Sequence, residues 1–153
     1  MATDLKINPA RREDLPRIIE LGQRMHEGST FADMDFDPEV TAQTMIACMD
    51  APNGTVLVAR KRGHIIGGVA AVTMPSFFGR DTVASDLAVF VEAGKRGRAA
   101  GYFILEAYVD WAKAQGVKRI NLGNSAGTND AAYQKLTGRL GFSRAGALMY
   151  LRV

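Results

Sequence analysis

The sequence is poor in the residues that build disulfides, metal centres and membrane spans. Cys48 is the only cysteine in 153 residues, so an internal disulfide is excluded and a cysteine-based metal site is not expected. Cys48 lies in an apolar stretch that reads as a helix, which favours a buried thiol over a nucleophile. No apolar run approaches the ~20 residues of a membrane span, and the first residues lack the layout of a signal peptide. We therefore predict a cytoplasmic protein with no metal and no membrane partner.

The excess of positive charge is small and local. Lysine and arginine number 19 against 16 acidic residues, a net charge of +3, and the cations gather at 60–62 and 95–98. This pattern suits a small polyanion, such as a nucleotide-containing cofactor, better than nucleic acid, which needs a broader basic stripe with stacking aromatics. A nucleic-acid-binding domain is our third hypothesis and rests on the cation clusters alone. The 47% hydrophobic and 23% charged content is typical of a globular protein, and the length fits a single domain, 1–153.

Alternating and helical hydrophobic patterns, separated by glycine and proline, divide the chain into strands and helices. A helix separates the strand at 81–91 from the strand at 117–122, so this pair is predicted to be parallel. The order of elements indicates an α/β domain with a mixed sheet. We expect strands at 5–8, 55–59, 65–72, 81–91, 117–122 and 147–153, and helices at 14–25, 37–50, 98–115 and 130–140.

The stretch 89–101 carries the clearest functional signal. An apolar strand breaks into a basic, glycine-rich turn and then enters a helical pattern. A helix N-terminus leaves backbone N–H groups unpaired and carries a partial positive charge, so it favours a bound phosphate. Lys95, Arg96 and Arg98 add cations beside it. The glycine spacing fits neither the P-loop nor the dinucleotide pattern, and an ordinary basic turn is the simpler alternative.

The hexapeptide Arg96–Gly101 fits the pattern R-x-x-G-x-G/A with Ala99 in place of the first glycine, and it resembles motif A of the GNAT superfamily of N-acetyltransferases. A second match lies at Asn129, Ala132 and Gly141-Phe142, and the order of elements is also similar. The resemblance implies the GNAT fold, a mixed central sheet of about six to seven strands flanked by about four helices, with a β-α-β acyl-CoA-binding core.

The resemblance also implies a function: transfer of an acetyl group from acetyl-CoA, as co-substrate, to a small-molecule or peptide amine by direct attack in a ternary complex, without a metal. A non-catalytic acyl-CoA-binding or sensing module of the same fold is the alternative. The exposed edge that ends such sheets can pair with a second copy, so a homodimer is among the expected partners. In the family, loop amides hold the pyrophosphate and the preceding strand pairs with the pantetheine arm. The cofactor-binding residues implied are Val89, Phe90, Val91, Arg96, Gly97, Arg98, Ala99, Ala100, Gly101, Tyr102 and Asn129.

Acetyl transfer to an amine needs a proton acceptor for the amine and a proton donor for the thiolate. Asp86, in the strand before motif A, is the candidate base, acting through a water, while a surface or capping aspartate is the alternative. His26 and Glu27 open a loop that lines the acceptor pocket in the family, and they are further candidates.

Tyr133 is the candidate acid, because a phenol can protonate a thiolate. It lies one turn before the position expected from the family, which Thr137 occupies. Core packing of Tyr133, or Tyr150 as a substitute, stays open. The acceptor itself carries no recognisable code: Phe31, Phe77 and Phe78 suggest an apolar component, whereas Asp33, Asp35 and Asp37 suggest a cationic acceptor.

Overall fold

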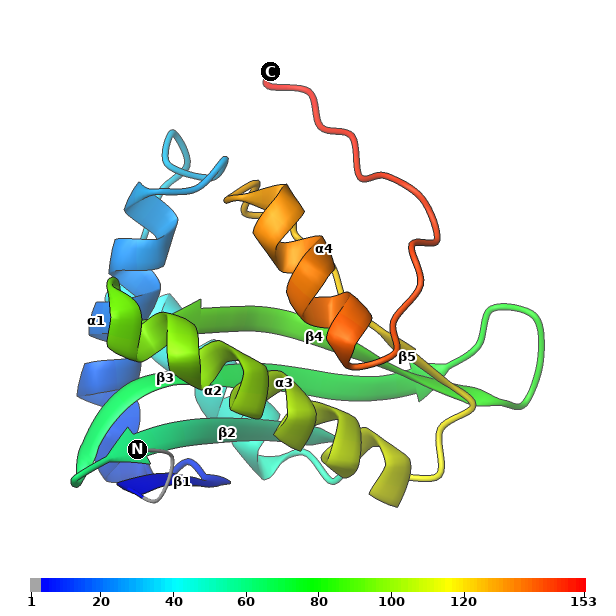
Figure 1. Cartoon of the computed structure of the whole chain (residues 1–153), viewed down its shortest axis with the longest axis horizontal. Coiled ribbons are helices and arrows are strands. Elements are labelled where there is room, and N and C mark those ends of the chain that lie inside the picture. The colour runs from blue at the N-terminus through cyan, green and yellow to red at the C-terminus, as the bar shows by residue number, and fades with distance from the viewer. Residues whose placement is uncertain (1–3) are drawn as a thin grey trace.

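A computed structural model describes residues 4–153 (Figure 1). The elements follow the order that the sequence predicts as far as the last helix. They are β1 (Leu5–Pro9), a 3-10 turn η2 (Arg12–Asp14), α1 (Leu15–Glu27), α2 (Pro38–Asp50), β2 (Gly54–Lys61), β3 (His64–Pro75), β4 (Thr82–Val91), α3 (Lys95–Ala114), β5 (Arg119–Asn121) and α4 (Asp130–Arg139).

Local chemistry explains the clearest boundaries. The Asp37 carboxylate accepts hydrogen bonds from the backbone N–H groups of Glu39, at 2.8 Å, and Val40, at 3.1 Å, so it caps the first turn of α2. Pro38 occupies the first helical position, where no N–H is needed. At the C-terminal end of α3, Gly116 has a φ of +75°, a conformation that glycine adopts without strain.

The sheet has the order β1-β2-β3-β4-β5. Strands β1 to β4 are antiparallel neighbours, whereas β4 and β5 are parallel and joined through α3. This confirms the predicted strand-helix-strand crossover. The helices α1 and α2 cover one face of the sheet and α3 covers the other, as Figure 1 shows.

Each face of the sheet has its own core. Side chains alternate between the faces along β2, so Val56 and Val58 pack with α1 and α2 while Leu57 and Ala59 pack with α3. Cys48 belongs to the α1/α2 core, where its Sγ donates to backbone carbonyls and burial raises the pKa of its thiol. These contacts fit a structural thiol.

Gly67 and Gly68 of β3 allow a close approach on both faces. A Cβ at Gly67 would lie 2.9 Å from Cδ1 of Ile104 in α3, and one at Gly68 would lie 2.6 Å from Cζ of Phe90. In the β2–β3 ladder the register shifts between Ala59, which pairs with Gly67, and Arg60, which pairs with Ile65, so a bulge at Ile66 adjoins the glycine pair. The β3–β4 ladder shifts register opposite Leu87. The glycine pair therefore lies beside a bulge and also allows close packing.

The predicted last strand, 147–153, is wrong. The described chain forms a five-stranded sheet, fewer than the expected six to seven strands, and residues 142–153 have no regular structure. Beside β5, a cavity of about 630 Å³ separates the strand from residues 140–145. The end of the chain is instead tied to the α1–α2 loop by Arg152, whose Nε lies 2.6 Å from Oδ2 of Asp33. The apolar pattern of residues 147–153 predicts extended structure, but it does not show whether a partner strand lies within reach.

Candidate active site

The two parallel strands part where the candidate base lies. The β4–β5 ladder ends at the pair Ser85 and Asn121, whereas β4 continues to Val91. A bulge opposite β3 leaves Leu87 without a partner there and 53% exposed. Among the described residues, the edge of β4 from Asp86 to Val91 that faces away from β3 has no strand against it, so its backbone groups are available to a ligand.

The basic turn that follows β4 does form a helix N-terminus. Gly94 has a φ of +97°, and α3 begins at the next residue, Lys95. The N–H of Arg98 already donates to the carbonyl of Gly94 at 3.2 Å. The N–H groups of Lys95, Arg96 and Gly97 therefore precede the intrahelical ladder and are the donors that a helix offers to an anion.

The remaining residues of the predicted anion loop lie one turn further into α3. Ala99, Ala100 and Gly101 are helical, so their N–H groups belong to the intrahelical ladder, and Ala100 is buried in the α3 core. Tyr102 lies on the side of α3 that faces α4, with its ring 4.9 Å from the guanidinium carbon of Arg139. The structure thus separates the motif into free donors at Lys95–Gly97 and a supporting helical turn behind them.

Gly97 is required for packing. A Cβ at this position would lie 1.7 Å from the carbonyl oxygen of Glu92, closer than any non-bonded contact allows. The absence of a side chain lets the first turn of α3 rest directly on the end of β4. The glycine therefore fixes where the helix N-terminus sits relative to the open strand edge.

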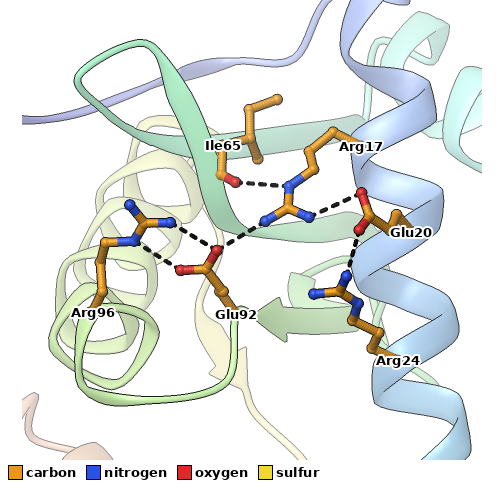
Figure 2. A network of polar contacts seen from close by, with 6 residues as sticks. All are labelled: Arg17, Glu20, Arg24, Ile65, Glu92 and Arg96. Atoms are coloured by element: carbon orange, nitrogen blue, oxygen red, sulfur yellow. Dashed lines mark hydrogen bonds and ion pairs between the residues drawn. The ribbon is translucent and has the colours of Figure 1, made fainter.

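An ion-pair network surrounds this junction (Figure 2). The Glu92 carboxylate accepts from Nε and Nη2 of Arg96, both at 2.8 Å, and from Nη2 of Arg17 at 3.0 Å. Arg17 also donates from Nε to the carbonyl of Ile65 at 3.1 Å and contacts Glu20 at 2.9 Å. These contacts connect the start of α3 with α1 and with the first residues of β3.

A cavity of about 520 Å³ opens beside this network. Its lining combines cations and carboxylates, and Arg60 already holds Asp14 through two hydrogen bonds. The pKa of Asp14 is lowered by that contact, although burial acts in the opposite direction. The lining residues are Glu13, Asp14, Arg17, Arg60, Gly63, His64, Ile65 and Arg96.

Other predicted cofactor residues divide between the core and the open edge. Phe90 is 1% exposed and packs in the α1/α2 core, so only its backbone faces the edge of β4. Val89 packs against the α3 core, and Val91 is 38% exposed. Asn129 has a left-handed backbone, and its side chain accepts the N–H of Ala132 at 3.3 Å, which caps α4.

The two predicted catalytic residues lie within electrostatic reach of each other. Burial raises the pKa of the Asp86 carboxyl, partly offset by a hydrogen bond of 3.2 Å from the N–H of Gly123. The Tyr133 hydroxyl is buried and has no hydrogen-bond partner among the described residues. Its pKa is raised by burial and by the charge of Asp86, as is that of Tyr108, whose hydroxyl donates to the carbonyl of Asn121 at 2.8 Å.

The loop after α1 closes against the loop after β5. Thr30 donates from its N–H to the carbonyl of Ala126 at 3.1 Å and from its hydroxyl to that of Ser125 at 2.7 Å. At the end of α1, the His26 ring lies 5.3 Å from that of Phe36, and its Nε2 is buried without a partner among the described residues. Both orphaned polar atoms, of His26 and Tyr133, belong to segments beside these two loops.

The alternative residues have simpler environments. Glu27 is exposed at the end of α1, and Tyr150 is 61% exposed in the irregular C-terminal segment. Thr137, at the position where the family has its tyrosine, donates its hydroxyl to carbonyls of its own helix. Of Tyr133, Thr137 and Tyr150, only Tyr133 has a buried side-chain oxygen without a hydrogen-bond partner among the described residues.

Three residues of the site were not singled out by sequence. Arg17 reads as one more charged residue on a helix surface, and Glu92 as part of a turn, because nothing in the sequence indicates their contact across 75 positions. Tyr108 is a core aromatic at helical spacing, as predicted, yet its hydroxyl also reaches the end of β5. Of these three residues, only Tyr108 could be suspected from the sequence, because it lies in the predicted helix between the two parallel strands.

None of the helices in residues 4–153 has the length and apolar character needed to span a membrane. Over the same residues, the structure contains no cluster of three or more histidine, cysteine or acidic side chains arranged to hold a metal ion.

The structure thus places two parallel strands that part beside a helix N-terminus, within a mixed sheet covered by helices on both faces. The family model described as "Acetyltransferase (GNAT) family" matches residues 16–142. The chain therefore belongs to the GNAT acetyltransferase family, as its motifs predicted. A comparison with curated proteins finds none that matches.

Solved structures with a similar fold carry several different names. An aminoglycoside acetyltransferase from an uncultured soil metagenomic sample, in complex with sisomicin, has a TM-score of 0.70 and 18% identity, over 99% of this chain and 97% of that one. A ribosomal-protein-alanine N-acetyltransferase from Brucella melitensis has a TM-score of 0.72 and 14% identity, over 97% and 99%. A protein named a transcriptional regulator, from Bacillus halodurans, has a TM-score of 0.78 and 17% identity, over 97% and 99%. At these identities the likeness shows the fold alone.

Proposed function

We propose that the protein transfers an acetyl group from acetyl-CoA to a primary amine by direct attack in a ternary complex. Membership of the GNAT family supports the reaction class. One structural observation carries the proposal: within residues 4–153, β4 runs on from Asp86 to Val91 without a partner strand on its outer edge and leads into the N-terminus of α3. An extended ligand with a diphosphate at one end fits this combination of an open strand edge and free helix donors.

In this proposal the donor binds along β4. The N–H groups of Lys95, Arg96 and Gly97 and the cations of this turn hold the diphosphate, while the backbone of Val89, Phe90 and Val91 pairs with the pantetheine arm. Arg98, Ala99, Ala100 and Gly101 form the helical turn that aims those donors, and Tyr102 and Asn129 border the site from α3 and α4. Binding energy far from the reacting atoms then positions the thioester.

The chemistry is assigned to Asp86 and Tyr133. The amine nitrogen attacks the thioester carbonyl carbon, the C–N bond forms, the C–S bond breaks, and the backbone N–H of Val89 or Val91 stabilises the oxyanion. Asp86, whose pKa is raised toward the working range of a general base, accepts the amine proton through a water. Tyr133 stays protonated because burial and then the charge of Asp86 raise the pKa of its hydroxyl, and it gives its proton to the CoA thiolate.

The acceptor is a small-molecule or peptide amine. The names of two structural neighbours support both choices, since one is an aminoglycoside acetyltransferase and the other a ribosomal-protein-alanine N-acetyltransferase. In the acidic stretch at 33–37, Asp33 is paired with Arg152 and Asp37 caps α2, so Asp35 is the acidic group that makes neither contact. We further expect a cytoplasmic protein that forms a homodimer through the open edge of β5.

The test combines donor binding with turnover. Acetyl-CoA at a hundredfold excess over its Kd stabilises a folded protein by roughly 2.7 kcal/mol, a shift of several degrees in melting temperature for a domain of this size. Release of the CoA thiol is then followed with a panel of neutral and cationic amines. Tyr133→Phe is expected to keep the thermal shift and lose turnover, and Tyr150→Phe is its matched control.

The same experiment separates the alternatives. A thermal shift without turnover on any amine indicates a non-catalytic acyl-CoA-binding module. An unchanged melting curve with acetyl-CoA and related esters rejects the donor site altogether.

A further inference from the structure

Glu92 occupies a decisive position between β4 and α3. It is the residue that follows the last residue of β4, and its carboxylate receives three N–H groups from two arginines (Figure 2). Two come from Arg96, in the first turn of α3, and one comes from Arg17 of α1. The contacts with Arg96 lower the pKa of the Glu92 carboxyl most, followed by those with Arg17, so it is an anion at neutral pH.

The two arginines differ in how firmly they are held. Arg17 is anchored at three places, the carbonyl of Ile65, Glu20 and Glu92, and its side chain is 28% exposed. Arg96 is 44% exposed, and among residues 4–153 its guanidinium has hydrogen bonds only to Glu92. Arg17 is therefore the fixed partner of Glu92, and Arg96 is the one that is free to leave.

Arg96 also belongs to the turn that supplies the free helix donors. Without a ligand, its charge is occupied by Glu92, an anion built into the chain. A ligand phosphate that uses Arg96 must first displace that carboxylate. A monophosphate exchanges one partner of Arg96 for another, whereas a diphosphate also spans the N–H groups of Lys95–Gly97.

We propose that Glu92 is the specificity-determining residue of the donor site: it holds Arg96 until a diphosphate displaces it, while Arg17 neutralises the carboxylate left behind. This inference rests on the proposed function, because it assumes that the donor diphosphate binds at the start of α3. It assigns Arg17 a positioning role on α1, without contact with the ligand.

Calorimetric titration with CoA, which binds without reacting, tests the proposal. Glu92→Gln keeps the shape of the side chain and removes its charge, so CoA is expected to bind about fivefold more tightly, because the ion pair with Arg96 that the diphosphate must displace is weakened. Inorganic phosphate should also become a better competitor of CoA in this variant. Glu106→Gln is the matched control, since Glu106 is exposed on α3 about 15 Å further along the helix and beyond the screening length.

A double-mutant cycle identifies Arg96 as the group that Glu92 holds. In an Arg96→Gln background, Glu92→Gln should change CoA affinity less than twofold. Arg17→Gln leaves Glu92 and α3 unchanged and should weaken CoA binding about threefold, an effect that disappears when Glu92→Gln is also present. Because Arg17→Gln acts through a different element, it tests the proposal even where Glu92→Gln lowers the melting temperature.

The outcomes are distinct. CoA affinity that is unchanged or weaker in Glu92→Gln, an equal gain in the Arg96→Gln background, or an Arg17→Gln effect that persists without Glu92 overturns the role of Glu92. If the wild type itself shows no heat of CoA binding and no thermal shift, the donor site of the proposed function fails instead.

Discussion

The two edges of β4 have opposite characters. Toward β3, its ladder is continuous from the pair of Thr82 with Pro75 to the pair of Val91 with Gly67, interrupted only by the bulge. Toward β5, the ladder covers only residues 83–85. One strand therefore contributes one edge to the stability of the sheet and leaves most of the other edge free.

The residues along the two edges follow this division. On the β3 side, glycines and small side chains allow close contacts with buried neighbours such as Phe90. On the β5 side, the Asp86 carboxyl is half-buried and the Tyr133 hydroxyl is buried with no hydrogen-bond partner among the described residues, an arrangement that costs stability and is typical of functional sites. The comparison teaches that stability and chemistry are separated across a single strand.

The largest expected effect comes from a substitution at the open edge of β4, which is the edge at residues 86–91 that faces away from β3. Asp86→Asn removes the proposed base, and kcat should fall about 10³-fold, since general base catalysis contributes roughly 10² to 10⁴. Thiol release measures kcat, and the thermal shift with acetyl-CoA should be retained. Asp110→Asn, an exposed change on α3, is the matched control. A kcat within tenfold of the wild type would remove Asp86 from the mechanism.

The pH dependence of the same variant gives an independent check. Burial raises the pKa of Asp86 above its ordinary value of 3.8, so the folded state prefers the protonated carboxyl. The stability that this preference contributes is present below pH 3.8 and is lost as the pH rises through the raised pKa. Asp86→Asn should therefore be more stable than the wild type at neutral pH, and the difference should vanish in urea titrations below pH 3.8. A variant that is less stable at neutral pH contradicts this reasoning.

The second prediction disturbs the side of the sheet where β4 pairs with β3, which we call the closed edge. Gly68→Ala places a Cβ 2.5 Å from the carbonyl oxygen of Leu57 and 2.6 Å from Cζ of Phe90, so backbone and ring must both shift. We expect the free energy of unfolding to fall by about 3 kcal/mol in urea denaturation, as for other overpacked cores.

Gly22→Ala is the control for Gly68→Ala. A Cβ at Gly22, in α1, meets nothing within 4 Å, so alanine there should stabilise the protein by about 0.5 kcal/mol through helix propensity. Equal effects of the two substitutions would contradict the packing of β3 described above.

The closed edge was also the more predictable one. Hydrophobic alternation locates β2, β3 and β4, because alternation depends on neighbours in the sequence. The open edge depends on where β5 stops, and nothing in residues 117–122 indicates that only 119–121 pair. The predicted strand at 147–153 is wrong for a related reason, since an apolar pattern predicts extended structure whether or not a partner strand is within reach.

The candidate site shows the same limit at the level of single residues. The motif around Arg96 and Gly97 located the helix N-terminus and the family, because that signal is local. The ion pair between Arg17 and Glu92 and the contact between Tyr108 and Asn121 could not be predicted, because each depends on how helices pack on the sheet.

A third, smaller effect concerns the end of the β4–β5 ladder, where the outer edge of β4 passes from paired to unpaired. Tyr108→Phe removes the hydrogen bond to the carbonyl of Asn121, the last paired residue of β5. The half-buried carbonyl loses its partner, so we expect the free energy of unfolding to fall by about 1.5 kcal/mol in urea denaturation. Tyr150→Phe, in the exposed C-terminal segment, should be neutral. Equal stability of Tyr108→Phe and the wild type would show that the end of β5 does not depend on α3.

The smallest effect concerns the contact that holds the C-terminal segment against the α1–α2 loop. Arg152 ties the C-terminal segment to Asp33 through a pair that is 58% and 50% exposed, and such pairs contribute little to global stability. Asp33→Asn should leave the melting temperature unchanged but free the segment, so chymotrypsin should cleave at Tyr150 about twofold faster, while Asp35→Asn should not change the rate. Slower cleavage in Asp33→Asn would mean that the released segment pairs with a strand, and the exposed edge of β5 is the place where that pairing is available.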